Sequence, residues 1–277
     1  MTSLPGCDHE AVAIHSVAER GFTRGADMYE RGRPGYPPAA MRWLSRRLAL
    51  GPGVCVVDLA AGTGKLTRLL AATGARVIAV EPVAAMRAAI GPGVEALEGR
   101  AEAIPLPDAT VDVVTVGQAF HWFDPDRALA EIHRVLRPAG ALALVWNVRR
   151  MEDPIHVAIE RLIEVHYAGV PRHRTGGWRA ALERTPLFEG LVERRFANRQ
   201  RLDADGLADR VGSTSVIAAL SPGERERILG RVRALAAGGP LTLRYACEIQ
   251  LVRAAAPPSR PGPGRTPPGP RTARTSS

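Results

Sequence analysis

The sequence contains no apolar run that approaches the roughly 20 residues needed to span a bilayer. Met1 to Glu10 also lack the basic and apolar pattern of a secretory signal peptide. Cysteine is scarce: Cys7, Cys55 and Cys247 are single residues without the spacing of a zinc site or a disulfide framework. These absences predict a cytoplasmic protein without a membrane segment, a structural metal or disulfides.

Lysine and aromatic residues are rare as well. Lys65 is the only lysine, so the net charge of +9 comes from arginine, and aromatic residues make up 5% of the chain. Four arginines lie in an acid-free C-terminal tail, and the net charge without them is +5. These four are Arg260, Arg265, Arg271 and Arg274. A nucleic-acid surface needs clustered basic residues and stacking platforms, so the composition disfavours a nucleic-acid substrate.

A ligand-binding turn follows the first apolar run, Val54–Val57. The run ends in Asp58 and is followed by small residues that include Gly62 and Gly64. A strand, a glycine turn and a helix in this order let a ligand approach backbone N–H groups closely. The next apolar run ends in a second acid, Glu81, where a ribose-binding carboxylate is expected. Two carboxylates beside the turn favour a cationic ligand over a pyrophosphate.

The turn lacks both common phosphate-binding patterns. A mononucleotide P-loop fails because Leu59 stands at its first glycine and Leu66 at its Ser or Thr. The dinucleotide pattern Gly-x-Gly-x-x-Gly fails because its third glycine is replaced by Thr67. A nicotinamide-dependent oxidoreductase on a similar fold therefore stays an alternative that the turn disfavours.

Four motifs in order resemble those of the class I S-adenosylmethionine-dependent methyltransferases, over roughly residues 22–146. They are Asp58–Gly64, Glu81-Pro82 with Met86, Gly99–Asp108 and Val135–Gly140. In the first motif Ala60 takes the place of the first small residue. The resemblance implies S-adenosylmethionine as the cofactor and S-adenosylhomocysteine as the product.

A segment ahead of this core, Tyr29–Pro37, is similar to one found in the trans-aconitate methyltransferases and their bacterial relatives. It follows the pattern Tyr-x-x-x-Arg-Pro-x-Tyr-Pro, and its prolines favour extended backbone. The resemblance implies that the segment folds over the methionine end of the cofactor and that Tyr29 and Arg33 contact it. The alternative is a surface arm that only packs on the domain. Gly32 is an addition that the pattern leaves unexplained.

Strands and helices are predicted to alternate through the core, which gives a parallel sheet with right-handed crossovers. The predicted strands are Val54–Asp58, Arg76–Glu81, Val94–Glu98, Val111–Val116, Ala141–Trp146, Leu191–Leu202 and Leu241–Val252. The predicted helices are Val12–Arg20, Ala39–Leu50, Lys65–Ala72, Val83–Ala89, Arg127–Leu136, Pro154–Gly169, Trp178–Arg184, Asp203–Val211 and Pro222–Ala236. The resemblance implies a Rossmann-like α/β fold. Its seven-stranded, mostly parallel sheet would have helices on both faces and an antiparallel seventh strand between the fifth and the sixth.

The resemblance also implies a set of cofactor contacts. These are Tyr29, Arg33, Asp58, Ala60, Gly62, Thr63, Gly64, Glu81, Pro82, Met86, Arg100, Ala101, Glu102, Gln118 and Ala119. Glu81 would bind the ribose hydroxyls, and Asp58 would organise the turn and face the amino end of the methionine. Many relatives have Asp at the place of Arg100. Because arginine has no acceptor, the backbone N–H of Ala101 is the expected adenine contact. Met86 either packs on the adenine or fills the core.

The fourth predicted strand ends in an aromatic cluster, residues 120–123, where the methyl group should emerge. His121 is the candidate catalytic residue, as a general base near neutral pH. Its alternatives are to orient a carboxylate or to serve as a structural histidine. The candidate acceptor contacts are Trp122, Trp146, Trp178, Ser213 and Ser215.

We expect four parts of the chain. These are an N-terminal arm and cofactor lid (1–50), a cofactor-binding core (51–147), a substrate-side C-terminal part (148–253) and a disordered tail (254–277). The predicted activity is methyl transfer to O or N of a small molecule, for which a carboxylate is one candidate, by a monomer or homodimer. A cofactor-binding protein without catalysis is a further alternative.

Overall fold

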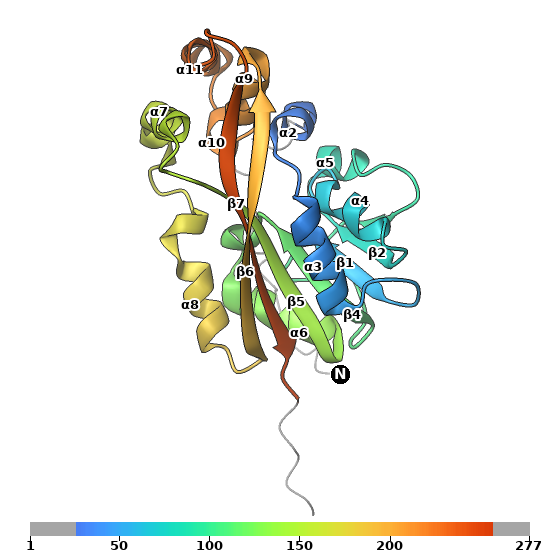
Figure 1. The fold of residues 1–277 in the computed structure, drawn as a ribbon. Coiled ribbons are helices and arrows are strands. Elements are labelled where there is room, and N and C mark those ends of the chain that lie inside the picture. The colour runs from blue at the N-terminus through green and yellow to red at the C-terminus, as the bar shows by residue number, and fades with distance from the viewer. Residues whose placement is uncertain (1–25, 257–277) are drawn as a thin grey trace, which may run out of the picture.

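The computed structural model of the 277-residue chain describes residues 26–256 (Figure 1). The predicted helix Val12–Arg20 and residues 257–277 of the predicted disordered tail lie outside the described residues. The tail was predicted to begin at residue 254, but strand pairing continues through Ala254, which lies opposite Phe188. The backbone N–H of Ala255 then donates to the carbonyl of Leu187. The proposed tail boundary is therefore a few residues too early.

A seven-stranded sheet in the order β3-β2-β1-β4-β5-β7-β6 forms the centre of the molecule (Figure 1). The strands are β1 (Cys55–Leu59), β2 (Arg76–Val80), β3 (Glu95–Leu97), β4 (Val111–Gly117), β5 (Leu136–Arg149), β6 (Phe188–Leu202) and β7 (Leu241–Ala254). The first five pair in parallel, whereas β7 runs antiparallel to both β5 and β6. The predicted Rossmann-like α/β fold is confirmed, including the place of β7 between β5 and β6.

Helices cover both faces of the sheet. Buried side chains of α6 and α8 pack on one face, and those of α3 and α4 pack on the other. A third apolar cluster joins α7, α9, α10 and α11 to β7 at one end of the sheet (Figure 1). The helices are α2 (Ala26–Gly32), α3 (Pro38–Leu48), α4 (Lys65–Ala71), α5 (Ala84–Ala88), α6 (Pro125–Val135), α7 (Pro154–Ile163), α8 (Gly177–Arg184), α9 (Ala204–Gly212), α10 (Ser215–Ala218) and α11 (Pro222–Ala234).

Several boundaries differ from the predicted ones. Helix α2 was not predicted, because the prolines that follow it indicate extended backbone. The predicted helix from Pro154 ends at Ile163 and gives way to a 3-10 turn. Ser221 precedes α11 at the N-cap position, but its side chain caps no backbone N–H. Asp203 does cap α9, since its carboxylate accepts from the N–H of Gly206.

The carboxyl ends of β1, β2 and β4 meet at one edge of the sheet, as parallel strands require. Helix α2 and the extended residues 33–37 lie close to this edge. The edge thereby gathers the turns that follow three strands under a short N-terminal helix. No helix among residues 26–256 is long and apolar enough to cross a membrane.

Candidate active site

The turn after β1 needs small residues because its backbone is left-handed. Ala60, Gly62 and Gly64 have φ values of 54°, 59° and 80°. Residues with a Cβ rarely adopt this region, and Ala60 is an uncommon case. Such backbone geometry often accompanies a binding function. The conformation explains why the motif has only alanine and glycine at these places.

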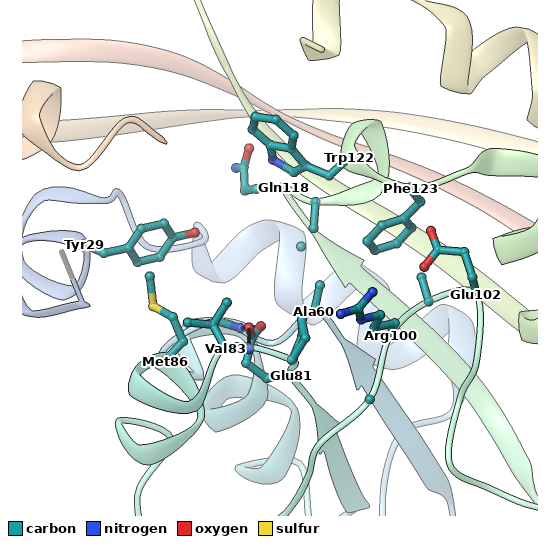
Figure 2. Close-up of a pocket in the computed structure, with 16 residues that line it drawn as sticks. Tyr29, Ala60, Glu81, Val83, Met86, Arg100, Glu102, Gln118, Trp122 and Phe123 are labelled. Carbon is teal, nitrogen blue, oxygen red and sulfur yellow. Dashed lines mark hydrogen bonds between the residues drawn. The ribbon is translucent and has the colours of Figure 1, made fainter. Parts of the chain in front are cut away.

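A first cavity of about 870 Å³, counting its open mouth, lies beside this turn. Most of the predicted cofactor residues line it: Tyr29, Ala60, Gly62, Glu81, Pro82, Met86, Arg100, Ala101, Glu102, Gln118 and Ala119. Figure 2 shows Tyr29 and Met86 on one side of the hollow and Arg100, Glu102 and Phe123 on the other. Apolar and aromatic side chains form much of the cavity wall, and the carboxylate of Glu81 lies at its base (Figure 2).

Glu81 is held in place by two backbone amides. Its Oε2 accepts from the N–H of Gly62 at 2.9 Å, and its Oε1 accepts from the N–H of Val83 at 2.9 Å. The residue is only 5% exposed, and burial raises the pKa of its carboxyl group. Each carboxylate oxygen keeps a lone pair. Glu81 therefore fixes the turn to the end of β2 and can still accept hydrogen bonds from a ligand.

Asp58 lies below a second cavity, which shares Tyr29, Ala60, Gly117 and Gln118 with the first. Its Oδ2 accepts from the hydroxyl of Thr67 at 2.6 Å, and its Oδ1 from the hydroxyl of Thr115 at 3.0 Å. Burial raises the pKa of Asp58 to about 6 in spite of these hydrogen bonds. The two acids therefore serve adjoining cavities.

Arg33 lines the second cavity as well. Its Nη2 donates to the carbonyl of Ser213 at 2.8 Å, and its guanidinium lies 4.9 Å from the ring centroid of Tyr29. Burial lowers the pKa of Arg33 to about 10, and the nearby Arg210 adds to this effect. The second cavity is therefore lined by a carboxylate and by guanidinium groups, a set of charges that suits an α-amino acid with its ammonium and carboxylate groups.

Helix α2 is clamped between the cofactor turn and α9. Glu30 accepts from the hydroxyl of Thr63 at 2.6 Å and pairs with Arg68. On the other side Arg31 pairs with Asp209 at 2.7 Å. A Cβ on Gly32 would stand within 2.7 Å of backbone atoms of Asp209 and Arg210. Gly32, which the sequence left unexplained, thus lets α2 approach the backbone of α9.

A third cavity of about 1110 Å³, counting its mouth, lies beyond Gln118. Trp122, Trp146, Ser215 and His121 line it, as predicted for acceptor contacts and the candidate base. Burial, followed by the effects of His173 and Arg33, lowers the pKa of His121 to about 3. The imidazole is therefore neutral and weakly basic at pH 7, which argues against its role as a general base.

Four predicted site residues do not reach the cavities. Trp178 lies behind Trp146, with ring centroids 5.0 Å apart, and its indole N–H donates to the carbonyl of His173. The hydroxyl of Ser213 donates to the carbonyl of Arg210. Thr63 is turned toward Glu30, and Gly64 is packed near Ile90. The sequence did not show which way the side chains of Trp178, Ser213 and Thr63 point, nor that the backbone at Gly64 is turned away from the cavities.

Sequence reasoning missed the charged and aromatic residues that complete the third cavity. They are Arg149, Glu160, Tyr167, Arg172, His173, Arg174 and Arg210. They come from β5, α7, two 3-10 turns and α9, and they follow no local pattern. The high arginine content was the only signal, and it was spread over the whole chain. Among residues 26–256 no group of acidic, histidine or cysteine side chains is arranged to hold a metal ion.

The sheet order, the small-residue turn after β1 and the acid after β2 define the architecture of a class I methyltransferase. A family model described as a methyltransferase domain matches residues 57–144. A methyltransferase of Schizosaccharomyces pombe, called uncharacterized, is 34% identical over 218 residues, which cover 76% of this chain and 84% of the relative. The chain belongs to the class I S-adenosylmethionine-dependent methyltransferases, whose cofactor is S-adenosylmethionine.

Two further comparisons agree with this assignment. An uncharacterized methyltransferase of Mycobacterium tuberculosis is 52% identical over 132 residues, which are 46% of this chain. The match spans only about half, 52%, of that relative's length. A solved structure from Anaeromyxobacter dehalogenans, given provisionally as a type II methyltransferase, has a TM-score of 0.59 and 28% identity. It covers 80% of this chain and 97% of its own. No comparison confirms the trans-aconitate subgroup.

Proposed function

We propose that the protein transfers a methyl group from S-adenosylmethionine to an oxygen or nitrogen atom of a small molecule, for which a carboxylate is the leading candidate. The observation that carries the proposal is the set of adjoining cavities at one sheet edge. The first offers Glu81 and apolar walls, and the second offers Asp58 and Arg33. The third opens beyond Gln118 and is large enough for an acceptor.

The described residues fit the cofactor in both of its halves. In the proposal Glu81 accepts from the ribose hydroxyls, while Met86 and Phe123 wall the adenine beside the backbone of Ala101. Arg33 and Asp58 face the carboxylate and ammonium groups of the methionine. When bound, the cofactor supplies a methyl group that its positive sulfur already activates, so the protein mainly has to position the acceptor.

A carboxylate acceptor agrees with the weak basicity of His121. An alcohol or ammonium acceptor has to lose a proton, which calls for a base with a pKa near the working pH. A carboxylate is already ionised at pH 7. His121 would then contact the acceptor without taking a proton.

Calorimetric titration of the purified protein with S-adenosylhomocysteine tests the proposed function. We expect one site per chain and no binding of NAD under the same conditions. Mass spectrometry of the copurified small molecules provides an independent check, and copurified NAD would overturn the proposal in favour of an oxidoreductase. Incubation with labelled S-adenosylmethionine and small-molecule extracts separates an enzyme from a non-catalytic binding protein, because only an enzyme labels a product.

A further inference from the structure

Orphaned nitrogen atoms gather around the third cavity. In the described part of the chain, six buried side-chain polar atoms have no hydrogen-bond partner. Four of them belong to residues that line this cavity: Arg33 Nε, His121 Nδ1, Trp146 Nε1 and His173 Nε2. Buried polar groups in native proteins are nearly always satisfied, so a cluster of exceptions needs an explanation. A ligand that brings the missing partners is such an explanation.

The orphaned atoms specify what the ligand must offer. Arg33 Nε and Trp146 Nε1 can only donate hydrogen bonds. His121 lines the same cavity, with its ring centroid 5.7 Å from that of Trp146, and the charge of Arg33 contributes to lowering its pKa. The ligand must therefore bring hydrogen-bond acceptors, such as the two oxygens of a carboxylate, to this corner of the cavity.

The charges around the cavity favour an anion. Among the described residues, Glu160 is the only carboxylate that lines it, and it pairs with Arg149 at 2.7 Å, with Arg174 at 3.0 Å and with Arg172 at 3.3 Å. Arg33 and Arg210 also line the cavity, and neither has a carboxylate within ion-pair distance among residues 26–256. Partly buried guanidinium groups without a counter-charge attract an anionic ligand.

The remaining walls are flat rings. Tyr29, His121, Trp122, Trp146, Tyr167 and His173 all line the cavity. The ring of Trp146 packs against His173, at 4.6 Å between ring centroids, and against Trp178. These two contacts hold the ring of Trp146 in a fixed place. Aromatic walls bind planar conjugated ligands by stacking and edge contacts. An aliphatic acid would use the charges but not these rings.

We propose that the third cavity binds an aromatic carboxylate as the methyl acceptor, with its oxygens on Arg33 Nε and Trp146 Nε1 and its ring between the aromatic walls. The inference rests on the proposed function. In the reaction a lone pair of the carboxylate oxygen forms the new O–CH₃ bond. The S–CH₃ bond breaks, and its electron pair stays on sulfur. The products are a methyl ester and S-adenosylhomocysteine, and no proton moves.

Three probes of similar size test the inference by calorimetry in the presence of saturating S-adenosylhomocysteine. They are 2-naphthoate, its saturated analogue decahydronaphthalene-2-carboxylate and the uncharged 2-naphthamide. We expect 2-naphthoate to bind at least about tenfold more tightly than either of the others, because only it uses both the rings and the cations. If the saturated acid binds as tightly as 2-naphthoate, the proposed role of the rings is refuted. If the amide binds as tightly as 2-naphthoate, the proposed role of the charge is refuted.

Trp146→Phe keeps an aromatic ring and removes the donor. We expect the affinity for 2-naphthoate to fall about tenfold, as for the loss of one hydrogen bond to a charged group, while the affinity for S-adenosylhomocysteine is unchanged. Trp43→Phe is the matched control, since Trp43 lies on α3 against Phe196, and it should change neither affinity. Unchanged 2-naphthoate binding by Trp146→Phe would overturn the assignment of the donor.

The two proposals fail in different ways. If S-adenosylhomocysteine binds and 2-naphthoate does not, the inference about the acceptor is wrong and the proposed function stands. If S-adenosylhomocysteine does not bind the wild-type protein, the proposed function is wrong and the inference falls with it. Should Trp146→Phe fail to fold, the comparison of the three probes on the wild-type protein still decides the matter.

Discussion

Replacing Glu81 by glutamine tests whether this side chain has both a structural and a binding role. The carboxylate receives the N–H groups of Gly62 and Val83, one on each oxygen. Glutamine has the same shape but only one acceptor oxygen, and its NH₂ group must then face a backbone N–H, donor against donor. The change is small in volume, so any loss reports on hydrogen bonding and charge and not on packing.

The magnitude for stability follows from this geometry. A buried N–H without an acceptor costs about 1–3 kcal/mol. Burial raises the pKa of Glu81, so the charged form carries a desolvation penalty that the neutral glutamine does not have. For Glu81→Gln the net loss in the free energy of unfolding should therefore lie near the lower end of this range, at about 1 kcal/mol. In a chain of this length that lowers Tm by roughly 2–4 °C.

Glu81→Gln should reduce the free energy of cofactor binding more than the free energy of unfolding. If Glu81 accepts from both ribose hydroxyls, the variant loses at least one hydrogen bond to a charged acceptor, worth about 1.5–3 kcal/mol. The Kd for S-adenosylhomocysteine should then rise about tenfold or more. Thermal unfolding and calorimetric titration on the same preparations give the two quantities.

Glu95→Gln is the matched control for this variant. It makes the same chemical change at an exposed site, where Glu95 pairs with Arg76 at 3.0 Å. An exposed pair of this kind contributes little, so Tm and Kd should both stay close to the wild type. If Glu81→Gln binds S-adenosylhomocysteine as tightly as the wild-type protein does, Glu81 is not a ribose contact and the reasoning about the first cavity is wrong.

Three further variants test other parts of the site. Because the pKa of Asp58 is raised in the folded protein, the wild type loses stability as the pH rises from about 4 to 6. Asp58→Asn removes this loss. In denaturant titrations, the free energy of unfolding of the variant relative to that of the wild type should therefore rise by about 3 kcal/mol between pH 4 and 7. Gly32→Ala should force α2 away from α9, which should lower the free energy of unfolding by about 1–3 kcal/mol and weaken the binding of S-adenosylhomocysteine. Gly35→Ala is the control, because no atom lies within 4 Å of its new Cβ, and it should change neither stability nor binding. Arg33→Met removes a desolvated charge that has no carboxylate partner among the described residues, so Tm should stay the same or rise. The same variant should weaken the binding of S-adenosylhomocysteine about tenfold. A drop in Tm with unchanged binding would show Arg33 to be structural. Arg42→Met, at an exposed position of α3, serves as the control and should change neither quantity.

The fold was predictable where short-range patterns determine it. Apolar runs that end in Asp58 and Glu81 are typical of buried parallel strands, and the alternation with helices predicts a parallel sheet with right-handed crossovers. The places of β6 and β7 came from the resemblance and not from the pattern. Helix α2 escaped notice because it is only seven residues long and its stability depends on packing against α9.

The two sides of the site differed in how far they could be predicted. The cofactor side is built from the residues just beyond β1, β2 and β4, and strand ends of a parallel sheet converge by topology. The third cavity is built from side chains far apart in the chain, such as Arg149, Tyr167, His173 and Arg210. Nothing in their spacing indicates that they meet. Trp178 and Ser213 illustrate the same limit, since residues close to them in the chain line the cavity but their own side chains point elsewhere.

The N-terminal segment links the two sides of the site physically. Tyr29 lines all three cavities, and Arg33 lines the second and the third. Helix α2, which contains Tyr29 and ends just before Arg33, is tied to the glycine turn through Glu30 and to α9 through the close approach at Gly32. A change that frees either tie moves residues that face both the cofactor and the acceptor cavities. Because the seven residues of α2 span the distance between the glycine turn and α9, the segment forms a wall that the cavities share, which supports the proposed role as a cofactor lid over that of a surface arm.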